Sequence, residues 1–492
     1  MEPTQSCSLA ADARRRSRRV RVRSLRRSGK KEAPSPAMSS PPTPHVLLVS
    51  APLQGHVNPL LVLGRRLASR GLLVTFTTAP HTGLKKVGHE NGAALDSVRR
   101  GAVRFEHLSG GGLWAPDDPR YRVPDDVARH LEDAAPAALA GLIRRQADAG
   151  RPVSCIVANA FAPWALRAAG AMGVPCAMLW TQSCAVLSLY YHYFHLLAAF
   201  TSEEAEADTQ VSVPGLPPLA AGDLPSLIHA PEDYIWRQTL VADIRSLRET
   251  ASWVLVNTFD ELEHAAIEAL RAHLPVVSIG PLFETENDAG HDECTAWLDA
   301  QTTRSVVFVA FGSVLKLSRD EMADLSEGLA DTGRPFLWVV RDDSRDLLPD
   351  NALAAATSGG GRVVSWCKQR RVLSHRAVGC FVTHCGWNST TEALVAGVPV
   401  VAYPAWSDQR TNAAFLVDVY GVGVRLVPTP PTRDAVRRCV EEVMSGAPEA
   451  EVMRARAEEW KAKASAAVAD GGSSDRGTRD FVDAVLSIGA GN

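Results

Sequence analysis

Residues 45–78 read HVLLVSAPLQGHVNPLLVLGRRLASRGLLVTFTT, and this pattern sets the fold class of the chain. Its first eight residues form an apolar, β-branched run typical of a strand buried on both faces. After the loop LQGHV, Asn58 is predicted to cap a helix with Pro59 at its first position, and leucines then recur at helical spacing up to Gly71. A second apolar run follows at once. The stretch is a β-α-β unit, which builds a parallel sheet covered by helices.

The same alternation of apolar runs and helical patterns returns in two series. The first series continues at residues 154–161, 175–183 and 252–259. The second lies at residues 305–313, 335–340, 362–366, 380–384 and 399–404. Because 492 residues exceed what one hydrophobic core usually supports, two domains are expected. The sequence therefore predicts an α/β protein of two doubly wound, Rossmann-like parallel-sheet domains with a binding cleft between them.

Changes in composition give the expected domain bounds. Residues 38–282 are predicted to form the N-terminal domain and residues 295–470 the C-terminal domain. The acidic, aperiodic residues 283–294 between them read as a linker. Residues 471–492 are expected to form a helix that packs back on the N-terminal domain, and residues 1–37 a basic, disordered extension.

Charge is distributed unevenly along the chain. The extension holds eleven Lys or Arg against Glu2, Asp12 and Glu32, so it carries +8 of a net charge of −3 and leaves −11 on the rest. An acidic body does not favour nucleic acid or an anionic membrane as a partner. The arginine run lacks the apolar segment of a secretion signal, which favours the cytoplasm, with a plastid or nuclear address as alternatives. Met38 leads directly into the first strand, and the choice between Met1 and Met38 as the functional start stays open.

Cysteine spacing and hydropathy exclude two further classes of protein. Nine cysteines without paired metal-ligand spacing indicate buried thiols in a reducing compartment and no metal site. No apolar stretch is long enough to span a bilayer. We expect a monomer that binds small molecules.

Most of the chemistry lies in residues 366–409, which read WCKQRRVLSHRAVGCFVTHCGWNSTTEALVAGVPVVAYPAWSDQ. The segment after the strand CFVTH falls at the carboxyl edge of the sheet, where open α/β sheets bind ligands. A helix predicted from about Ser389 to Ala396 points unpaired N–H groups at that edge, which favours a diphosphate. Ser389 and Glu392 also fit a capping box that serves only the helix itself. Trp366 suits either a core position or a stack on a flat base.

This block resembles the signature box of plant secondary-product UDP-glycosyltransferases over its full length, and residues 45–490 follow the order of that family. The family consists of inverting enzymes with the GT-B fold, in which two Rossmann-like domains face each other across a cleft. The resemblance implies UDP-glucose as the donor substrate, with no metal and no further cofactor. Lys368, where the family usually has proline, and Ala405 depart from its pattern.

The resemblance assigns the donor-binding residues position by position. Trp366 would stack the uracil, while Gln369 and the main chain at Cys367 would hydrogen-bond the uridine. Glu392 would bind the ribose hydroxyls. The contacts to the diphosphate would come from Ser313, His384, Asn388 and Ser389.

The sugar is assigned in the same way. Asp408 and Gln409 would bind its hydroxyls, with Trp387 beside them. A glutamine at the last position of the family's box goes with glucose. Thr181 matches a threonine that touches the sugar in other members, although the branch described below often has valine there.

Transfer to a hydroxyl needs a base, and His56 lies in a segment, QGHVNP, that resembles the family's base-bearing loop. A loop histidine satisfied by the backbone is the alternative. The family orients this histidine with an aspartate, and the present chain has Asn159 at that position. Because an amide cannot stabilise imidazolium by charge, base catalysis on alcohols should be weak. Restoring the acid by Asn159→Asp is then expected to raise activity on phenols more than on acids.

A carboxylic acid avoids this weakness, since a pKa of about 4 leaves it ionised at neutral pH without any base. Independently, the segments at residues 163–164, 179–186 and 190–195 resemble the branch that esterifies hydroxycinnamic, benzoic and indole-type acids. Both observations predict a 1-O-acyl-β-glucose ester as product. The alternatives are a glucoside of a phenolic or flavonoid hydroxyl, and a sugar-nucleotide-binding protein without turnover. The candidates to stack an aromatic acceptor, if they are not core residues, are Trp114, Tyr190 and Tyr191.

Overall fold

The computed structural model describes residues 43–79, 102–202, 205–283, 293–313, 315–349 and 360–490. The predicted extension at 1–37, Met38 and almost all of the predicted linker lie outside these ranges. From Pro42 onward the chain forms one compact unit. Within the described ranges, none of the helices is both long and apolar enough to cross a bilayer.

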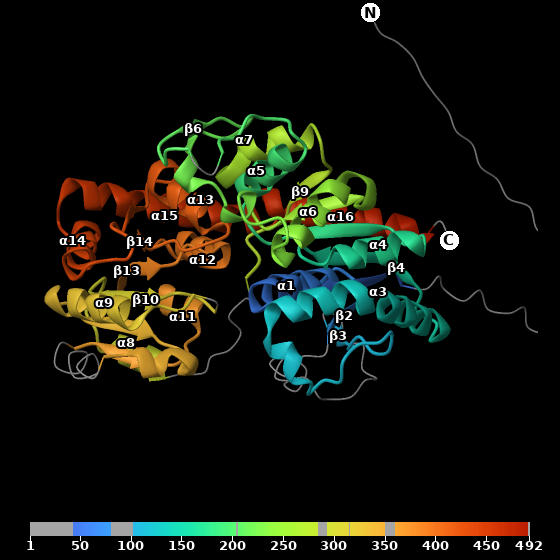
Figure 1. The fold of residues 1–492 in the computed structure, drawn as a ribbon, viewed down its shortest axis with the longest axis horizontal. Helices are drawn as coiled ribbons and strands as arrows, with labels where there is room; N and C mark the ends of the chain where they lie inside the picture. The colour runs from blue at the N-terminus through green and yellow to red at the C-terminus, as the bar shows by residue number, and fades with distance from the viewer. Residues whose placement is uncertain are drawn as a thin grey trace, which may run out of the picture. The chain divides into compact units, whose positions relative to one another are not determined.

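The N-terminal sheet is parallel and has the strand order β3-β2-β1-β4-β5-β8-β9 (Figure 1). Its strands are β1 (His45–Ser50), β2 (Leu73–Thr78), β3 (Arg104–Phe105), β4 (Val153–Asn159), β5 (Cys176–Trp180), β8 (Trp253–Val256) and β9 (Val276–Ser278). All six residues of β1 are buried, as expected for a central strand covered on both faces. The strand order reverses between β1 and β4, so a crevice opens beyond the carboxyl ends of these two strands.

The C-terminal sheet repeats this plan in the parallel order β12-β11-β10-β13-β14-β15. Its strands are β10 (Val306–Ala310), β11 (Phe336–Val339), β12 (Arg362–Val364), β13 (Val378–Thr383), β14 (Val400–Ala402) and β15 (Gly423–Arg425). Here the order reverses between β10 and β13. The predicted fold class, two doubly wound Rossmann-like domains, is confirmed.

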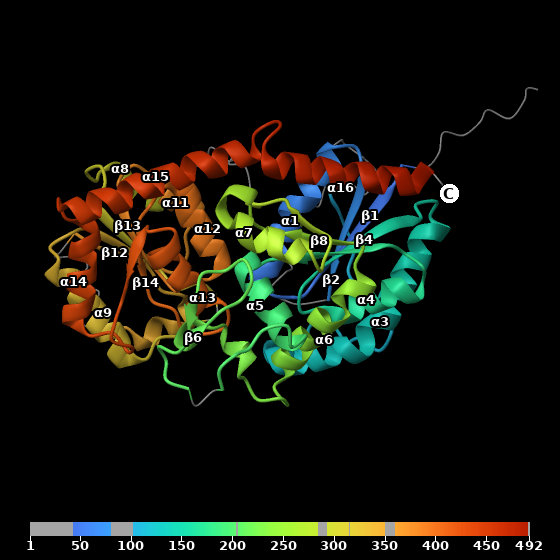
Figure 2. The same ribbon diagram turned by 90° about the horizontal axis from the view of Figure 1, so that it is seen from above.

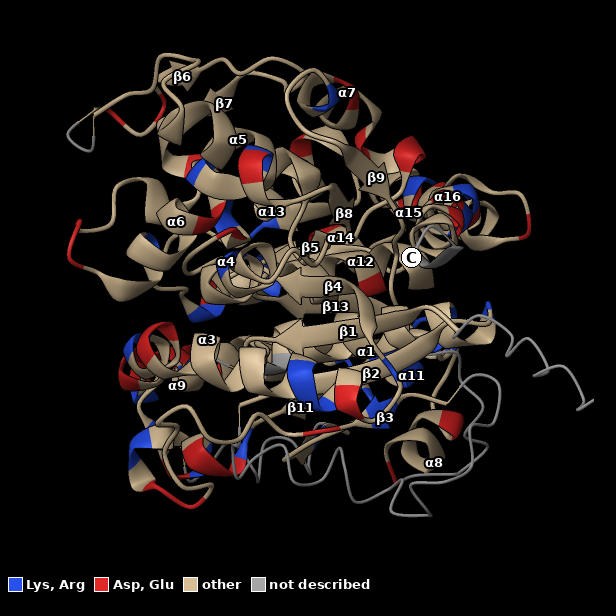
Figure 3. Ribbon diagram, turned by 90° about the vertical axis from the view of Figure 1, so that its right-hand side faces the viewer, with Lys and Arg blue, Asp and Glu red and all other residues tan. Residues whose placement is uncertain are grey.

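Helices cover both sheets and carry most of the charge, whereas β1, β4 and β13 hold no charged residue (Figure 3). The helices before the second sheet are α1 (Gln54–Ser69), α3 (Pro124–Asp148), α4 (Pro163–Ala171), α5 (Cys184–Phe194), α6 (Ile235–Thr250) and α7 (Asp260–Arg271). The later ones are α8 (Glu293–Asp299), α9 (Arg319–Asp331), α11 (Gln369–Leu373), α12 (Trp387–Ala396), α13 (Gln409–Ala414), α14 (Arg433–Met444), α15 (Pro448–Val468) and α16 (Ser473–Ala490). A short antiparallel pair, β6 (Gln210–Val211) and β7 (Leu219–Ala220), lies between α5 and α6 in the chain.

The last two helices run one after the other along the same side of both sheets (Figure 2). The first of them, α15, packs on α12, and α16 packs on β9, β4 and α7. Two contacts fix α16 on the N-terminal half: Phe481 meets the ring of Trp253 edge to face at 5.4 Å, and Asp475 pairs with Arg70 at 2.6 Å.

The first helix differs from the prediction. It begins at Gln54 with Leu53 as its N-cap, so His56 lies in its first turn and Pro59 lies inside it. Asn58 is therefore not the cap. Proline has no N–H to give to the carbonyl four residues earlier, which belongs to Gly55. That carbonyl instead accepts a hydrogen bond of 3.0 Å from the side-chain amide of Asn388, in the other domain.

Candidate active site

The turn from β1 into α1 lies between two cavities. Residues 51–53 wall an apolar pocket on the N-terminal half, whereas Gly55, Asn58 and Pro59 line a larger cleft shared with the C-terminal half. His56 lies in this turn, directly after Gly55. Both reversals of strand order thus contribute to one site, which is the location expected for ligands in open α/β sheets.

The cleft has a volume of about 570 Å³ and takes residues from both halves of the molecule. Seven of the predicted donor residues line it: Ser313, Trp366, Cys367, Gln369, Asn388, Ser389 and Glu392. The side chain of Trp366 is 69% exposed, which excludes the alternative of a core tryptophan. An exposed indole on the wall of a polar cleft suits stacking on a flat ring.

Ser389 and Glu392 do not form a capping box. The N-cap of α12 is Gly386 and the helix begins at Trp387, two residues before its predicted start. Both side chains instead accept hydrogen bonds from the amide of Gln369, at 2.9 Å to Ser389 Oγ and 2.7 Å to Glu392 Oε2. Three predicted ligand residues therefore hold one another in place.

Glu392 lies half-buried in the wall of the cleft. Desolvation raises the pKa of its carboxyl group to about 7, although the hydrogen bond from Gln369 and the charge of Arg370 act in the opposite direction. A carboxylate in this position offers acceptor oxygens to a pair of hydroxyl groups. Its charge state changes within the physiological pH range.

Two glycines make room for the imidazole of His384. A methyl group at Gly312 would lie 2.6 Å from His384 Nε2, and one at Gly386 would lie 2.5 Å from the same atom. Gly312 also has a φ of +68°, a conformation that L side chains rarely adopt. Burial lowers the pKa of His384 to about 4, and its Nδ1 is a buried atom without a hydrogen-bond partner in the described part of the chain. The ring is therefore neutral at pH 7.

The residues predicted to bind the sugar lie behind the cleft wall. Trp387 is 3% exposed and its indole N–H donates to the carbonyl of Asn257 at 2.8 Å. Asp408 accepts a 2.7 Å bond from Asn412, and burial raises its pKa to about 6. Gln409 Oε1 accepts the backbone N–H groups of residues 405 and 406, at 2.9 and 3.2 Å. No described residue accepts from its Nε2, which leaves that amide able to donate.

Cationic side chains that the sequence reasoning did not select also line the cleft. They are Arg341, Lys368, Arg370 and Arg371, and Glu392 is the one acid among the lining residues. Such a balance attracts a diphosphate. Arg341 lies two residues beyond the end of β11, so the rule that ligands sit beyond the carboxyl ends of strands points to it.

His56 has a neutral environment. Its Nδ1 lies 3.3 Å from the hydroxyl of Thr181, a long hydrogen bond, and its ring meets Phe161 edge to face at 5.5 Å. Burial alone lowers its pKa to about 4, and no charged group of the described residues contributes. The hydroxyl of Thr181, predicted to touch the sugar, thus contacts the imidazole.

Asn159 does not touch the imidazole of His56, contrary to what a dyad position suggests. Its Oδ1 accepts from the backbone N–H of Ala51 at 2.8 Å, and its Nδ2 donates to Ser50 Oγ at 3.0 Å and to the carbonyl of His56 at 3.1 Å. The side chain is 1% exposed. It fixes the turn that carries His56, and this use of both a donor and an acceptor requires an amide.

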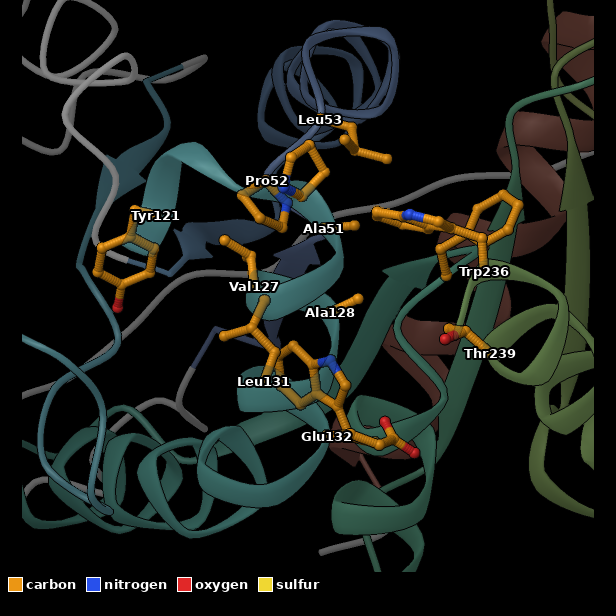
Figure 4. Close-up of a pocket in the computed structure, with 13 residues that line it drawn as sticks. Ala51, Pro52, Leu53, Tyr121, Val127, Ala128, Leu131, Glu132, Trp236 and Thr239 are labelled. Carbon is orange, nitrogen blue, oxygen red and sulfur yellow. The ribbon is translucent and has the colours of Figure 1, made fainter. Parts of the chain in front are cut away.

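The apolar pocket beside His56 has a volume of about 70 Å³ (Figure 4). Its walls come from the turns after β1 and β4, from the residues just before α3, and from helices α3, α4 and α6. They include Tyr121, Val127, Leu131, Phe161, Trp164 and Trp236. Glu132 is the one charged lining residue, and it pairs with Arg167. Figure 4 shows Glu132 across the pocket from Pro52 and Leu53. Among these wall residues, Trp164 belongs to a segment that resembles the acid-esterifying branch, and Phe161 follows Asn159 by two positions. The other wall residues belong to no sequence motif that pointed to the acceptor.

The three aromatic residues predicted to stack an acceptor lie outside this pocket. Tyr190 and Tyr191 are 0% and 3% exposed and belong to the hydrophobic core. The ring of Trp114 is stacked on His130 at 3.8 Å and meets the guanidinium of Arg120 at 4.2 Å. For the two tyrosines the core alternative is correct, because α5 is buried along nearly its whole length.

Comparisons with known proteins show the family of the chain. A family model described as UDP-glucoronosyl and UDP-glucosyl transferase matches residues 237–456. A gallate 1-beta-glucosyltransferase of Punica granatum is 42% identical over 91% of this chain and 90% of its own length. A cinnamate beta-D-glucosyltransferase of Fragaria ananassa is 39% identical over 92% of this chain and 84% of its own length.

Among solved structures, Os79 from O. sativa in complex with UDP superposes with a TM-score of 0.79 at 32% identity. The match covers 89% of this chain and all of that one. Sequence identity of this extent over nine-tenths of the chain, together with the shared fold, shows a common family. The chain belongs to the UDP-glucoronosyl and UDP-glucosyl transferase family and is a UDP-glycosyltransferase with the GT-B fold.

Proposed function

We propose that the enzyme transfers glucose from UDP-glucose to the carboxylate of a small aromatic acid, forming a 1-O-acyl-β-glucose ester with inversion. The observation that carries the proposal is the neutral surrounding of His56. Its imidazole has a hydroxyl and a phenyl ring as neighbours and a pKa of about 4. Such a group is a weak base, since efficient general bases have pKa values near the working pH.

A carboxylate acceptor makes this weakness irrelevant. Its oxygen attacks the anomeric carbon, the bond from that carbon to the diphosphate breaks, and UDP leaves with the electron pair. No proton moves, because an aromatic acid with a pKa of about 4 is already ionised. A phenol, by contrast, must lose a proton in the same step.

The charge of the apolar pocket supports the orientation of such an acceptor. Glu132 lies at one side of the pocket and is already paired with Arg167, so it offers no partner to an ionised acid. The ionised group of the acceptor is therefore expected at the side of Pro52 and Leu53, where the chain continues to His56. The aromatic body then lies among apolar side chains such as Phe161 and Trp236. Two relatives are named as glucosyltransferases of gallate and of cinnamate, which favours the same acceptor class.

The donor assignment belongs to this proposal as well. Trp366 stacks the uracil, Gln369 and Cys367 bind the uridine, and Glu392 binds the ribose hydroxyls. The diphosphate contacts Ser313, His384, Asn388 and Ser389, and the helix dipole of α12 stabilises the leaving UDP. Gln409 donates its amide to the glucose, with Asp408 accepting from it.

Product chemistry tests the proposal. The protein is incubated with UDP-glucose and a mixture of aromatic acids and phenols, and the products are treated with hydroxylamine. Esters are cleaved by hydroxylamine and glucosides survive it. Hydroxylamine-labile products are expected, and products that are all stable would replace the proposal by glucoside formation on phenols.

A further inference from the structure

Among the described residues, the one polar partner of the His56 imidazole is a hydroxyl group. Thr181 Oγ1 lies 3.3 Å from Nδ1, and Thr181 is 4% exposed. No described residue forms a hydrogen bond with His56 Nε2. Among the described residues, Thr181 is therefore the group that influences whether Nδ1 carries the proton, while Nε2 is available to the acceptor.

A hydroxyl differs from a carboxylate in what it can support. An ionised carboxylate only accepts, so it forces the proton of a neutral imidazole onto Nδ1 and leaves a lone pair on Nε2. A threonine hydroxyl rotates and can either donate or accept. It can therefore donate to Nδ1 and leave the proton on Nε2.

The two tautomers suit different acceptors. A lone pair on Nε2 removes a proton from a hydroxyl, but it repels the lone pairs of a carboxylate. An N–H on Nε2 donates to a carboxylate oxygen and holds it in place. Asn159 takes no part in this choice, because its side chain is occupied by Ala51, Ser50 and the main chain of His56.

We propose that Thr181 is a positioning residue that donates its hydroxyl proton to His56 Nδ1, so that His56 Nε2–H binds the carboxylate of the acceptor. His56 then orients the acid and accepts no proton during transfer. This inference rests on the proposed function, since it requires an acid as acceptor. It gives His56 the role of a hydrogen-bond donor in place of a base.

The test uses 4-hydroxybenzoate, whose carboxylate and phenol compete for the same site. Hydroxylamine treatment separates its ester from its glucoside, so each variant yields both rates from one reaction. Thr181→Val removes the hydroxyl at nearly constant volume, and Thr181→Ser keeps it. We expect Thr181→Val to lower kcat/KM for the ester by about three- to tenfold, the effect of one hydrogen bond, mainly through KM. Thr181→Ser should restore it.

A second readout follows the proton directly. In protein labelled with ¹⁵N-histidine, the His56 signal is assigned by its loss in His56→Ala. With UDP and 4-hydroxybenzoate bound, wild type should carry its proton on Nε2, whereas Thr181→Val should not favour that tautomer. A merely structural role of Thr181 would move neither the tautomer nor the ratio of ester to glucoside.

The outcomes separate the two proposals. If wild type forms no ester, the proposed function fails. If wild type and Thr181→Val form ester at equal kcat/KM, or if His56 carries its proton on Nδ1 with the acid bound, the role of Thr181 is wrong while ester formation stands. Thermal unfolding of each variant identifies a folding defect. If Thr181→Val is destabilised, the ester kcat/KM of Thr181→Ser alone tests whether the hydroxyl is sufficient.

Discussion

The donor half and the acceptor half of the site use the same architecture in opposite ways. Each lies where the strand order of a doubly wound sheet reverses. The donor half presents many polar groups that hold one another, such as Gln369 with Ser389 and Glu392. The acceptor half presents a mainly apolar pocket and, beside it, a neutral imidazole whose Nδ1 contacts the hydroxyl of Thr181. Donor recognition is thus specified group by group, whereas acceptor recognition depends on shape and on the charge of the acceptor itself.

The sharpest way to break the donor half is to move His384 without replacing it. Gly312→Ala would place a methyl group 2.6 Å from His384 Nε2, and displacement of a preorganised group by about 1 Å can cost about a hundredfold in rate. We expect a loss of that size in kcat/KM for UDP-glucose. Gly333→Ala is the matched control, because Gly333 also has a positive φ but no atom within 4 Å of the added methyl group. Equal losses in both variants would show that backbone strain is responsible.

Substitution of Asn159 tests whether its side chain supports the turn at His56 or acts with the imidazole as a weakened dyad. Asn159→Asp replaces the two N–H groups given to Ser50 and His56 by an acceptor, so we expect the free energy of unfolding to fall by about 1–3 kcal/mol and activity to fall on both acids and phenols. This reverses the expectation that the acid would favour phenols.

Urea unfolding measures the effect on stability, with Asn257→Asp as the control. Asn257 is equally buried and its Oδ1 also accepts one backbone N–H, but its Nδ2 is among the buried atoms without a partner in the described residues. The control therefore carries the cost of a buried acid alone. Higher phenol activity of Asn159→Asp at unchanged stability would support the interpretation of residue 159 as the dyad partner of His56.

The pH dependence of donor binding tests the carboxyl group at the ribose position. The pKa of Glu392 is about 7, and the ionised form accepts from two hydroxyls, so affinity is complete above pH 7 and is lost as pH falls through it. Between pH 8 and pH 6 we expect the Kd of UDP-glucose to rise about tenfold. UDP-glucose avoids the titration of a terminal phosphate, and isothermal calorimetry gives the values.

Glu392→Gln should flatten this profile. A slope that persists in the variant would belong to another group, and Asp408, with a pKa of about 6, is the candidate in the same half. His384 does not contribute, because its pKa of about 4 keeps it neutral throughout the range.

The smallest effect is expected from the acceptor pocket, where no single residue dominates. Trp236→Ala removes one apolar wall, and we expect KM for the acid to rise about fivefold, as for loss of one aromatic contact, while KM for UDP-glucose stays constant. Trp253→Ala removes an indole that packs on Phe481 and should leave both constants unchanged. A rise in KM for UDP-glucose in Trp236→Ala would mean that the pocket and the cleft do not bind their substrates independently.

The fold could be predicted because the strands buried on both faces leave continuous apolar runs in the sequence. The strands that escaped prediction are short, such as β3 with two residues and β9 with three. The predicted start of α1 is wrong because proline usually marks the first turn of a helix. Here Pro59 lies inside α1, and the carbonyl that it leaves unpaired accepts a hydrogen bond from the other domain.

The two halves of the site also differ in how well the sequence predicts them. Donor residues cluster in one block of the chain, where spacing alone brings them to one sheet edge. The acceptor pocket combines residues from Ala51 to Thr239, and only the three-dimensional fold brings them together. Ordinary apolar residues leave no local pattern that marks a binding pocket. The sequence therefore points to the aromatic residues Tyr190 and Tyr191, which are buried, and not to Phe161 and Trp236, which line the pocket.

The proline inside α1 has a consequence for how the two halves respond to each other. The carbonyl of Gly55 receives one of the two amide hydrogens of Asn388, and Asn388 stands where the diphosphate is proposed to bind. A single side chain thus touches both the helix turn that holds His56 and the position of the leaving group. A shift of α12 is transmitted through this bond to the turn that carries His56. Mutations in the donor box are therefore expected to alter acceptor preference without touching the acceptor pocket.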